Sequence, residues 1–366
     1  MKTIPVRNSI ICQNNDSIFN YYGWPSIARL PDKTLAMVAS GHRLGHICSF
    51  GKAVMCYSRD EGRSWGEQII IIDTLLDDRD AGICVFGDGT VIITSFNNTA
   101  AEQRNYLTWR GKDDMCFSIV NDYIEIIEKM PETEKKHLGS TFRLSKDGGY
   151  VFGEIKHSPV TAPHGPVVMN DGNLLYVGKD HHIRGETNPI KCYKLYPDGN
   201  MEYLCSIEDV QPETGNNEWL NCEPHAVVLP DGKIITHIRM QCKNDDFFTV
   251  YQAESSDGGK SFTVPHPIGL AHGSPPHLLL HSSGVLISSY GYRREPFGQR
   301  VMLSKDGGET WDTDYILRDD GNNDDLGYPA TVELNDRSLL TVYYQAEKNR
   351  DNCVIMQSIW ELPADL

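Results

Sequence analysis

The sequence predicts an all-β fold, a six-bladed β-propeller that forms one domain over residues 1–366. Two repeats that run in step carry this prediction: a short polar octet that occurs four times, and an apolar hairpin that occurs six times. A four-stranded propeller blade takes roughly 40–50 residues. Six blades, their loops and one insertion therefore fill the 366 residues of the chain.

The octets share the pattern Ser-x-Asp-x-Gly-x-x-Trp/Phe, and they occur at Ser58–Trp65, Ser145–Phe152, Ser255–Phe262 and Ser304–Trp311. In such a turn the Asp carboxylate accepts backbone N–H bonds, and the Gly supplies a positive φ. The aromatic residue packs under the turn and fixes it. Four copies in one chain indicate a structural repeat that serves stability rather than chemistry.

Each hairpin joins two apolar strands through a polar turn, and Asp-Gly between alternating hydrophobic residues is a strong hairpin signal. The six hairpins span Ser26–Val38, Gly82–Phe96, Pro166–Val177, His225–Arg239, His277–Tyr290 and Ala330–Tyr344. We expect each hairpin to belong to one blade. Ser9–Gln13 and Cys353–Trp360 are then available to close the ring at the last blade.

One stretch interrupts the β pattern. From about residue 112 to 137 the apolar residues recur at the spacing of an amphipathic helix, and Pro131 is expected to end it. This helical insertion lengthens blade two. It is either a packed decoration or an element that shapes a pocket or a dimer interface, so a homo-oligomer stays open.

Composition excludes several classes of partner. The formal net charge of −16 argues against nucleic acid and anionic membranes, which require a basic face. Met1–Asn8 contain no apolar run, so we expect no signal peptide and no membrane span. The ten Cys are scattered without a Cys-x-x-Cys pair, and this favours free thiols in the cytoplasm over disulfides or a metal site.

The innermost strands of a propeller all start at one end of its central channel, which we call the pit. Five of the six begin with small or rigid turns, which are Gly23-Trp24-Pro25, His164-Gly165-Pro166, Glu223-Pro224-His225, Ser274-Pro275-Pro276 and Gly327-Tyr328-Pro329. The remaining strand begins with Asp77–Gly82. Pro at the start of a strand fixes the direction of the backbone. The polar side chains beside these prolines form either a functional site or a solvated ring of ion pairs.

These octets and strand starts resemble the sialidase superfamily, whose six-bladed propellers carry Asp boxes. The resemblance spans nearly the whole chain. It implies a Tyr that attacks the sugar, a Glu that takes the Tyr proton, three Arg that bind the substrate carboxylate, and an Asp that acts as acid and base. A neutral phenol avoids repulsion with an anionic substrate, but it needs a carboxylate to accept its proton.

The resemblance implies that Tyr328 is the nucleophile and that Glu223 is its partner. It also implies that Arg239 binds the substrate carboxylate. The remaining substrate-binding candidates are Arg293, Arg294, Arg300 and, as an accessory residue, Arg43. Because guanidinium groups bind carboxylates in a bidentate manner, an acidic sugar at the non-reducing end of a glycan is the implied substrate.

Two positions depart from the family pattern. The Phe/Tyr-Arg-Ile-Pro motif reads Tyr22-Gly23-Trp24-Pro25, and the loop Leu44–Gly51 contains no carboxylate. Asp78-Arg79-Asp80 offers a replacement for both losses, with Asp78 and Asp80 as candidate acids and Arg79 as a substrate-binding cation. His46, His164 and His225 are further candidates for proton transfer near neutral pH.

Each candidate has a structural alternative. Tyr328 and Glu223 can form a structural hydrogen bond, Arg79 can belong to an ion network with its Asp neighbours, and Trp24 is either a sugar-stacking platform or part of the core. No cofactor or metal is expected, because His42/His46 and His277/His281 have helical spacing but lie in a loop and a hairpin.

Three functions therefore remain open for a carbohydrate ligand. The first is a sialidase-like glycoside hydrolase in which Tyr328 and Glu223 act with Arg239 and Arg294, and Asp78 or Asp80 protonates the leaving oxygen. The second is a lyase that eliminates across a uronate. The third is a non-catalytic glycan-binding propeller. Hydrolysis adds water to the products and elimination does not.

Overall fold

The computed structural model describes residues 2–110, 117–180, 188–212, 218–244, 247–346 and 352–364. These residues form six antiparallel sheets of four strands, one of them extended by a short parallel strand, together with three helices. Each innermost strand lies beside the innermost strand of the next blade, and the last of them lies beside the first. The predicted six-bladed propeller is confirmed.

The first half of the ring contains blades one to three. Blade one comprises β3 (Tyr21–Arg29), β4 (Leu35–Arg43), β5 (Lys52–Ser58) and β6 (Ile69–Ile72). Blade two comprises β7 (Asp77–Val85), β8 (Val91–Asn98), β9 (Ser140–Ser145) and β10 (Lys156–Ser158). Blade three comprises β11 (Val167–Val168), β12 (Leu174–Gly178), β13 (Ile190–Leu195) and β14 (Met201–Ile207).

The second half contains blades four to six. Blade four comprises β15 (Trp219–Val228), β16 (Ile234–Cys242), β17 (Phe248–Ser255) and β18 (His266–Pro267). Blade five comprises β19 (Gly273–Leu280), β20 (Leu286–Tyr292), β21 (Gly298–Ser304), β22 (Asp312–Arg318) and the parallel strand β1 (Lys2–Thr3). Blade six comprises β23 (Gly327–Glu333), β24 (Leu339–Ala346), β25 (Cys353–Trp360) and β2 (Val6–Cys12).

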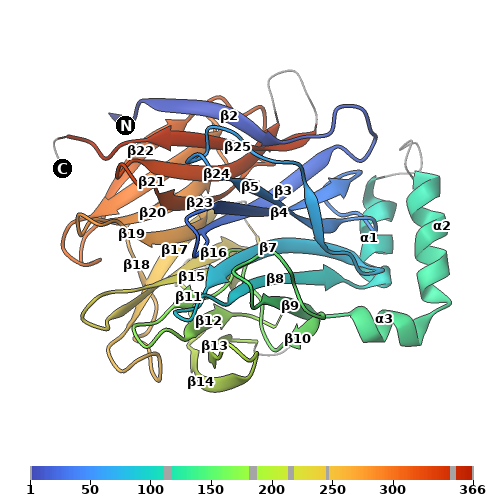
Figure 1. The fold of residues 1–366 in the computed structure, drawn as a ribbon, viewed down its shortest axis with the longest axis horizontal. Helices are drawn as coiled ribbons and strands as arrows, with labels where there is room; N and C mark the ends of the chain where they lie inside the picture. Colours follow the sequence, from blue (N-terminus) through green and yellow to red (C-terminus); the bar gives the residue numbers. More distant parts are fainter. Residues whose placement is uncertain are drawn as a thin grey trace.

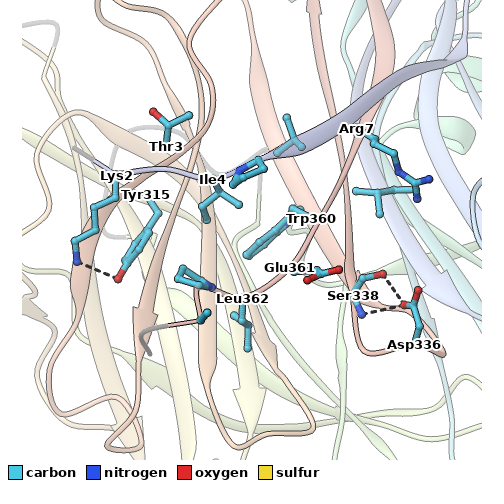
Figure 2. Close-up of a pocket in the computed structure, with 15 residues that line it drawn as sticks. Lys2, Thr3, Ile4, Arg7, Tyr315, Asp336, Ser338, Trp360, Glu361 and Leu362 are labelled. Atoms are coloured by element: carbon cyan, nitrogen blue, oxygen red, sulfur yellow. Dashed lines mark hydrogen bonds between the residues drawn. The ribbon is translucent and has the colours of Figure 1, made fainter.

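The ring closes where the two ends of the chain meet. Strand β2 pairs antiparallel with β25, from Val6 opposite Trp360 to Cys12 opposite Ile355, so the predicted closure is confirmed. The two chain ends lie on the same side of the molecule (Figure 1). Figure 2 shows the seam, where Trp360 lies beside the N-terminal segment in an open cavity of about 840 Å³. Outer strands and terminal segments line this cavity, and it is separate from the pit.

The octets form the turns between the third and fourth strands of blades one, two, four and five. In blade one, Ser58 Oγ donates to Asp60 over 2.9 Å, and the Ser64 N–H donates to the same carboxylate over 2.9 Å. The Gly62 N–H donates to Ser58 Oγ over 2.9 Å, and Gly62 has a φ of 77°. The other three octets repeat these bonds, as the sequence predicts.

All four octets also bind the preceding blade in the ring, two of them through a Gln side chain. Trp65 Nε1 donates to Gln357 of blade six over 3.0 Å, and Gln357 Nε2 donates to the Gly62 carbonyl over 2.6 Å. Gln252 of blade four makes the same pair of bonds to the octet of blade five, where Trp311 Nε1 donates to it over 2.8 Å. The octet therefore fixes neighbouring blades to each other as well as its own turn.

The helical insertion lies between β8 and β9 and projects at one edge of the propeller (Figure 1). It comprises α1 (Ala100–Arg110), α2 (Phe117–Glu128) and α3 (Pro131–His137). Helical structure thus begins earlier than the predicted residue 112, and residues 112–116 lie outside the described part of the chain. Pro131 follows the end of α2, but it also starts α3, because the first helical position needs no N–H.

The insertion supports the loop that follows β4. The buried face of α2 shares one apolar cluster with Leu44 and Cys48 of this loop. Gln103 of α1 accepts a hydrogen bond from Ser49. None of the helices in the described ranges is long and apolar enough to cross a membrane. The nine cysteines that the structure describes are all free.

We predict that Gln357→Leu lowers the free energy of unfolding, because it leaves the Trp65 N–H and the Gly62 carbonyl without their partner. Each buried polar group that loses its hydrogen bond costs about 1–3 kcal/mol. Urea unfolding followed by fluorescence measures the change. Gln13→Leu, at an exposed position, is the control. Equal stability of the two variants would contradict the proposed role of the octets in joining blades.

Candidate active site

Four innermost strands reach the pit through the same backbone distortion. Trp24, Asp80, Glu223 and Tyr328 have φ angles of 53°, 49°, 46° and 49°, and each lies where the pairing with the second strand shifts register. A left-handed conformation costs a residue other than Gly on the order of 1–3 kcal/mol. Bulges of this kind re-aim a side chain, and here they bring four side chains of different blades together.

Tyr328 and Glu223 form a hydrogen-bonded pair with Arg239. The Tyr328 hydroxyl donates to Glu223 Oε1 over 2.8 Å. Arg239 Nη1 donates to Glu223 Oε2 and, over 3.3 Å, to the Tyr328 hydroxyl oxygen. Tyr328 is 5% exposed and Arg239 is 7% exposed. The structure therefore brings together Tyr328, Glu223 and Arg239, for which the sequence suggests the roles of nucleophile, proton acceptor and carboxylate-binding residue.

The protonation states of this pair follow from its surroundings. Burial and the neighbouring Glu223 raise the pKa of Tyr328 well above its usual value. Burial alone would raise the pKa of Glu223, but the charge and hydrogen bonds of Arg239 and the hydrogen bond from Tyr328 lower it below its usual value. At neutral pH the phenol therefore keeps its proton and faces an ionised carboxylate.

Arg293 lies next to this pair. Its guanidinium carbon is 5.6 Å from the centroid of the Tyr328 ring and 5.9 Å from that of Phe248, and the guanidinium of Arg239 lies 4.8 Å from the Phe248 ring. The sequence offered both Arg293 and Arg294, and the contacts with Tyr328 and Phe248 belong to Arg293.

Arg293 makes no hydrogen bond or ion pair with any residue of the described ranges, and its Nε is buried. The Nε of Arg239 is likewise buried without a partner there. The third candidate of this group, Arg300, is buried and packs on Tyr292, with its guanidinium 3.3 Å from the ring centroid.

Trp24 is the packing centre of the pit. It is 1% exposed, and the guanidinium carbon of Arg79 lies 4.2 Å from its ring centroid. The rings of His46, Tyr328 and Tyr344 surround it at centroid distances of 4.8, 6.4 and 5.6 Å. The indole therefore has no open face, and this placement favours the structural alternative over the sugar-stacking role.

The two Asp residues of blade two have different surroundings. Asp80 Oδ1 lies 3.8 Å from Arg79 Nε, and burial together with the charge of Glu223 raises the pKa of Asp80 to about 7, against the effect of Arg79. Asp78 accepts hydrogen bonds from Thr74, over 2.6 Å from its N–H and 2.9 Å from its hydroxyl. Burial raises the pKa of Asp78 to about 7 as well. Asp80 thus lies with the Tyr–Glu pair, whereas Asp78 anchors the segment before β7.

Arg43 is fully buried and holds the backbone around it. It forms an ion pair with Asp77 and donates to the carbonyl oxygens of Gly45, His46 and Asp78 over 3.3, 3.0 and 3.1 Å. Arg79 Nη1 also donates to the His46 carbonyl, over 3.2 Å. With its donors engaged in this way, Arg43 positions the loop rather than facing a substrate as the sequence suggested.

A carboxylate that sequence reasoning missed completes the rim of the pit. Asp325 accepts hydrogen bonds from the hydroxyl groups of Tyr21, over 2.8 Å, and Tyr344, over 3.1 Å, and it lies 3.1 Å from His46 Nδ1. Burial would raise its pKa, but His46 and Tyr21 lower the pKa of Asp325 to about 2. The sequence signal for Asp325 is its position three residues before Tyr328, but the residue lies in a run of similar polar residues, Asn322–Asp325.

Three histidines fill the channel beside Tyr328. His164, His225 and His277 have ring centroids 4.3 to 5.6 Å apart, and His164 lies 6.4 Å from the Tyr328 ring. His225 Nδ1 accepts the Leu278 N–H over 2.9 Å. Burial lowers the pKa of all three, to about 3 for His277, so they are neutral at neutral pH. Sequence reasoning identified His164 and His225 but not His277 as part of this group.

The described residues contain no group of three or more His, Cys, Asp or Glu side chains arranged to hold a metal ion. The pit assembles the phenol of Tyr328, the carboxylates of Glu223, Asp80 and Asp325, and three guanidinium groups, from Arg79, Arg239 and Arg293. This arrangement can bind an anion and can move a proton between Tyr328 and Glu223.

Comparisons with known proteins agree with this description. The profile of the family of BNR repeat-like domains matches residues 126–342, which is more than half of the chain. A search of curated protein sequences finds no match.

Several solved structures share the fold. A protein of unknown function from Dyadobacter fermentans has a TM-score of 0.76 at 19% identity, over 98% of this chain and 99% of that chain. The NanB sialidase from Streptococcus pneumoniae has a TM-score of 0.64 at 13% identity, and the match covers 97% of this chain and 70% of that chain. An α-L-arabinanase from Penicillium chrysogenum complexed with arabinobiose has a TM-score of 0.64 at 14% identity, over 98% of both chains.

We predict that Asp80→Asn weakens the dependence of stability on pH. The pKa of Asp80 is about 7 in the folded protein and 3.8 as its ordinary value, so the folded state holds a proton that the unfolded chain has released. This contribution to stability is complete below about pH 4 and is lost as the pH rises through about 7, at up to about 1.4 kcal/mol per pH unit.

Urea unfolding at pH 5 and pH 8 tests this prediction. The wild type should lose more stability than the Asp80→Asn variant between the two pH values, and the exposed Asp16→Asn should behave like the wild type. Parallel losses in the wild type and Asp80→Asn would show that Asp80 does not hold a proton in the folded state.

Proposed function

Because this chain belongs to the family of BNR repeat-like domains, a branch of the sialidase superfamily, we propose that it is a glycoside hydrolase. Its substrate would be a sugar with a carboxylate at the non-reducing end of a glycan. The observation that carries the proposal is the hydrogen-bonded pair of Tyr328 and Glu223 beside Arg293, whose guanidinium makes no hydrogen bond or ion pair with the described residues. The solved structures of the same fold include a sialidase and an arabinanase, and this supports a carbohydrate substrate.

The arginines favour an anionic substrate. Burying a cation without a partner is costly, so such a group is expected to meet an anion in the functional state. Arg293 and the free Nε of Arg239 flank Tyr328, and together they offer donors suited to a carboxylate. Within a chain of net charge −16, this local positive potential would be selective for the acidic end of a glycan.

The Tyr–Glu pair fits nucleophilic catalysis. The Tyr328 oxygen bonds to the anomeric carbon while its proton passes to Glu223, 2.8 Å away. Arg239 keeps Glu223 ionised until that moment. A neutral nucleophile avoids repulsion with the substrate carboxylate, which is the reason for a Tyr in place of a carboxylate in such a site.

Asp80 suits substrate binding in this scheme. Asp80 interacts electrostatically with both Glu223 and Tyr328, so it lies on the side of the nucleophile. The leaving oxygen points away from the nucleophile during the reaction. We therefore assign Asp80 to a hydroxyl group of the bound sugar rather than to the leaving oxygen.

We predict that the protein releases a monosaccharide with added water from at least one member of a panel of sialosides, other keto-acid glycosides and uronate-capped oligosaccharides. Mass spectrometry identifies the products. Glu223→Gln should slow release by about 10²–10⁴-fold, the usual contribution of a general base, and Tyr328→Phe should slow it at least as much. Products without added water would favour a uronate lyase, and binding without turnover would favour a glycan-binding propeller.

We also predict that Arg293→Met raises the KM for the carboxylate-bearing substrate by about 10–150-fold, because a hydrogen bond to a charged group contributes about 1.5–3 kcal/mol. The neighbouring Arg294→Met is the matched control and should change KM little. The same sugar with its carboxylate reduced to an alcohol should bind both variants equally. A larger effect of Arg294→Met would transfer the carboxylate-binding role to that residue.

A further inference from the structure

The proposed hydrolase still requires a group that protonates the leaving oxygen, and the loop after β4 contains no carboxylate. We propose that His46 is this acid, and the base for the incoming water, with Asp325 as the residue that positions its ring. This inference rests on the proposed function and adds a second catalytic group to it.

The hydrogen bonds of His46 fix its tautomer. Its Nδ1 lies 3.1 Å from Asp325 Oδ1 and 3.1 Å from the Tyr21 hydroxyl oxygen. Tyr21 and Tyr344 donate their own protons to Asp325, so the carboxylate is held in place and accepts the proton of Nδ1. The opposite nitrogen, Nε2, makes no hydrogen bond with the described part of the chain, so it can carry the second proton of the imidazolium and give it to a substrate.

The loop around His46 is held rigidly enough for such a role. Its carbonyl oxygen accepts hydrogen bonds from Arg43, over 3.0 Å, and Arg79, over 3.2 Å. The ring meets the Trp24 indole edge to face at a centroid distance of 4.8 Å, and Tyr328 meets the same indole at 6.4 Å. The His46 side chain is 37% exposed, so it lies at the mouth of the pit, whereas Tyr328 lies deep in it.

Charged groups around His46 couple its proton to substrate binding. The titratable and charged groups around the ring are Asp325, Tyr21, Arg79 and Arg293, while Tyr344 donates to Asp325 and Arg43 to the His46 carbonyl oxygen. Burial and the charges of Arg79 and Arg293 lower the pKa of His46, against the effect of Asp325. A substrate carboxylate that neutralises these arginines would raise that pKa, so the imidazolium would form when the substrate is bound.

Bonds and protons balance in both steps of the proposed reaction, the transfer of the sugar to Tyr328 and its release by water. In the first, the C–O bond to the leaving group breaks as Nε2–H of the imidazolium gives its proton to the leaving oxygen, and a neutral alcohol departs. Tyr328 bonds to the anomeric carbon, and its proton moves to Glu223. In the second, neutral His46 Nε2 takes a proton from water as the water oxygen bonds to the anomeric carbon. The Tyr328 oxygen leaves and recovers its proton from Glu223.

Leaving groups of different acidity test this assignment. The probes are the 4-nitrophenyl and methyl glycosides of the panel sugar that is turned over. A nitrophenolate leaves without an acid, whereas methanol needs one. His46→Gln should therefore reduce kcat/KM for the methyl glycoside by about 10²–10⁴-fold and change that for the nitrophenyl glycoside much less. Asp325→Asn should show the same pattern with smaller losses, and His42→Gln, four residues earlier, is the control.

The pH profile separates an acid from a structural residue. In the wild type, kcat for the methyl glycoside should fall on the alkaline side as His46 loses its proton, and that limb should lie at higher pH for kcat than for kcat/KM. His46→Gln should lose this limb. Equal losses for both glycosides, or an unchanged alkaline limb, would overturn the assignment.

A spectroscopic test does not depend on turnover. In ¹⁵N-histidine-labelled protein, the neutral His46 ring should carry its proton on Nδ1, and Asp325→Asn should shift it towards Nε2; the signal is identified by its loss in His46→Gln. A neutral His46 ring with its proton on Nε2 in the wild type would contradict the proposed hydrogen bond from Nδ1 to Asp325. Full activity of Tyr328→Phe would instead overturn the proposed function and leave this result for His46 standing.

Discussion

The pit depends on one backbone constraint, the left-handed bulge at the start of the innermost strands. A regular strand directs successive side chains to opposite faces of its sheet. The bulges at Trp24, Asp80, Glu223 and Tyr328 break that alternation at equivalent places in four blades. Without them these side chains would follow the faces of their own sheets, and the hydrogen bond between Glu223 and Tyr328, from blades four and six, would not form.

The electrostatics of the pit oppose those of the molecule as a whole. The chain is strongly acidic, yet several guanidinium groups lie in the pit. These arginines have two different roles. Arg43 is fully satisfied by Asp77 and backbone carbonyls, and it holds the loop of His46 in place. Arg293 has no ion pair in the described ranges. Arg43 and Arg293 therefore differ in whether hydrogen bonds and an ion pair within the described chain hold the guanidinium in place.

The sequence predicted the fold well because propeller repeats leave local signals: a polar turn after each innermost strand and an octet after several third strands. The resemblance to sialidases implied that Glu223 is the partner of Tyr328, and the two side chains do form a hydrogen bond. The sequence could not predict that Arg43 is buried, because its partner Asp77 comes from another blade, or that Asp78 turns back to bind Thr74 four residues earlier, because this depends on the local backbone path. Asp325 was missed because it lies in a run of similar polar residues, and only tertiary contacts distinguish it.

The closure of the ring has a consequence for how the protein is made. Strand β2 completes blade six only when β25 is available, so during synthesis β2 waits for a strand that comes after the other five blades. Trp24 and Tyr328 belong to blades one and six, which meet at that seam. A nascent chain that still lacks β23 to β25 cannot complete this seam, so the pit assembles only after these strands have been synthesised. Loss of the C-terminal strand would thus abolish the site before it abolished most of the fold.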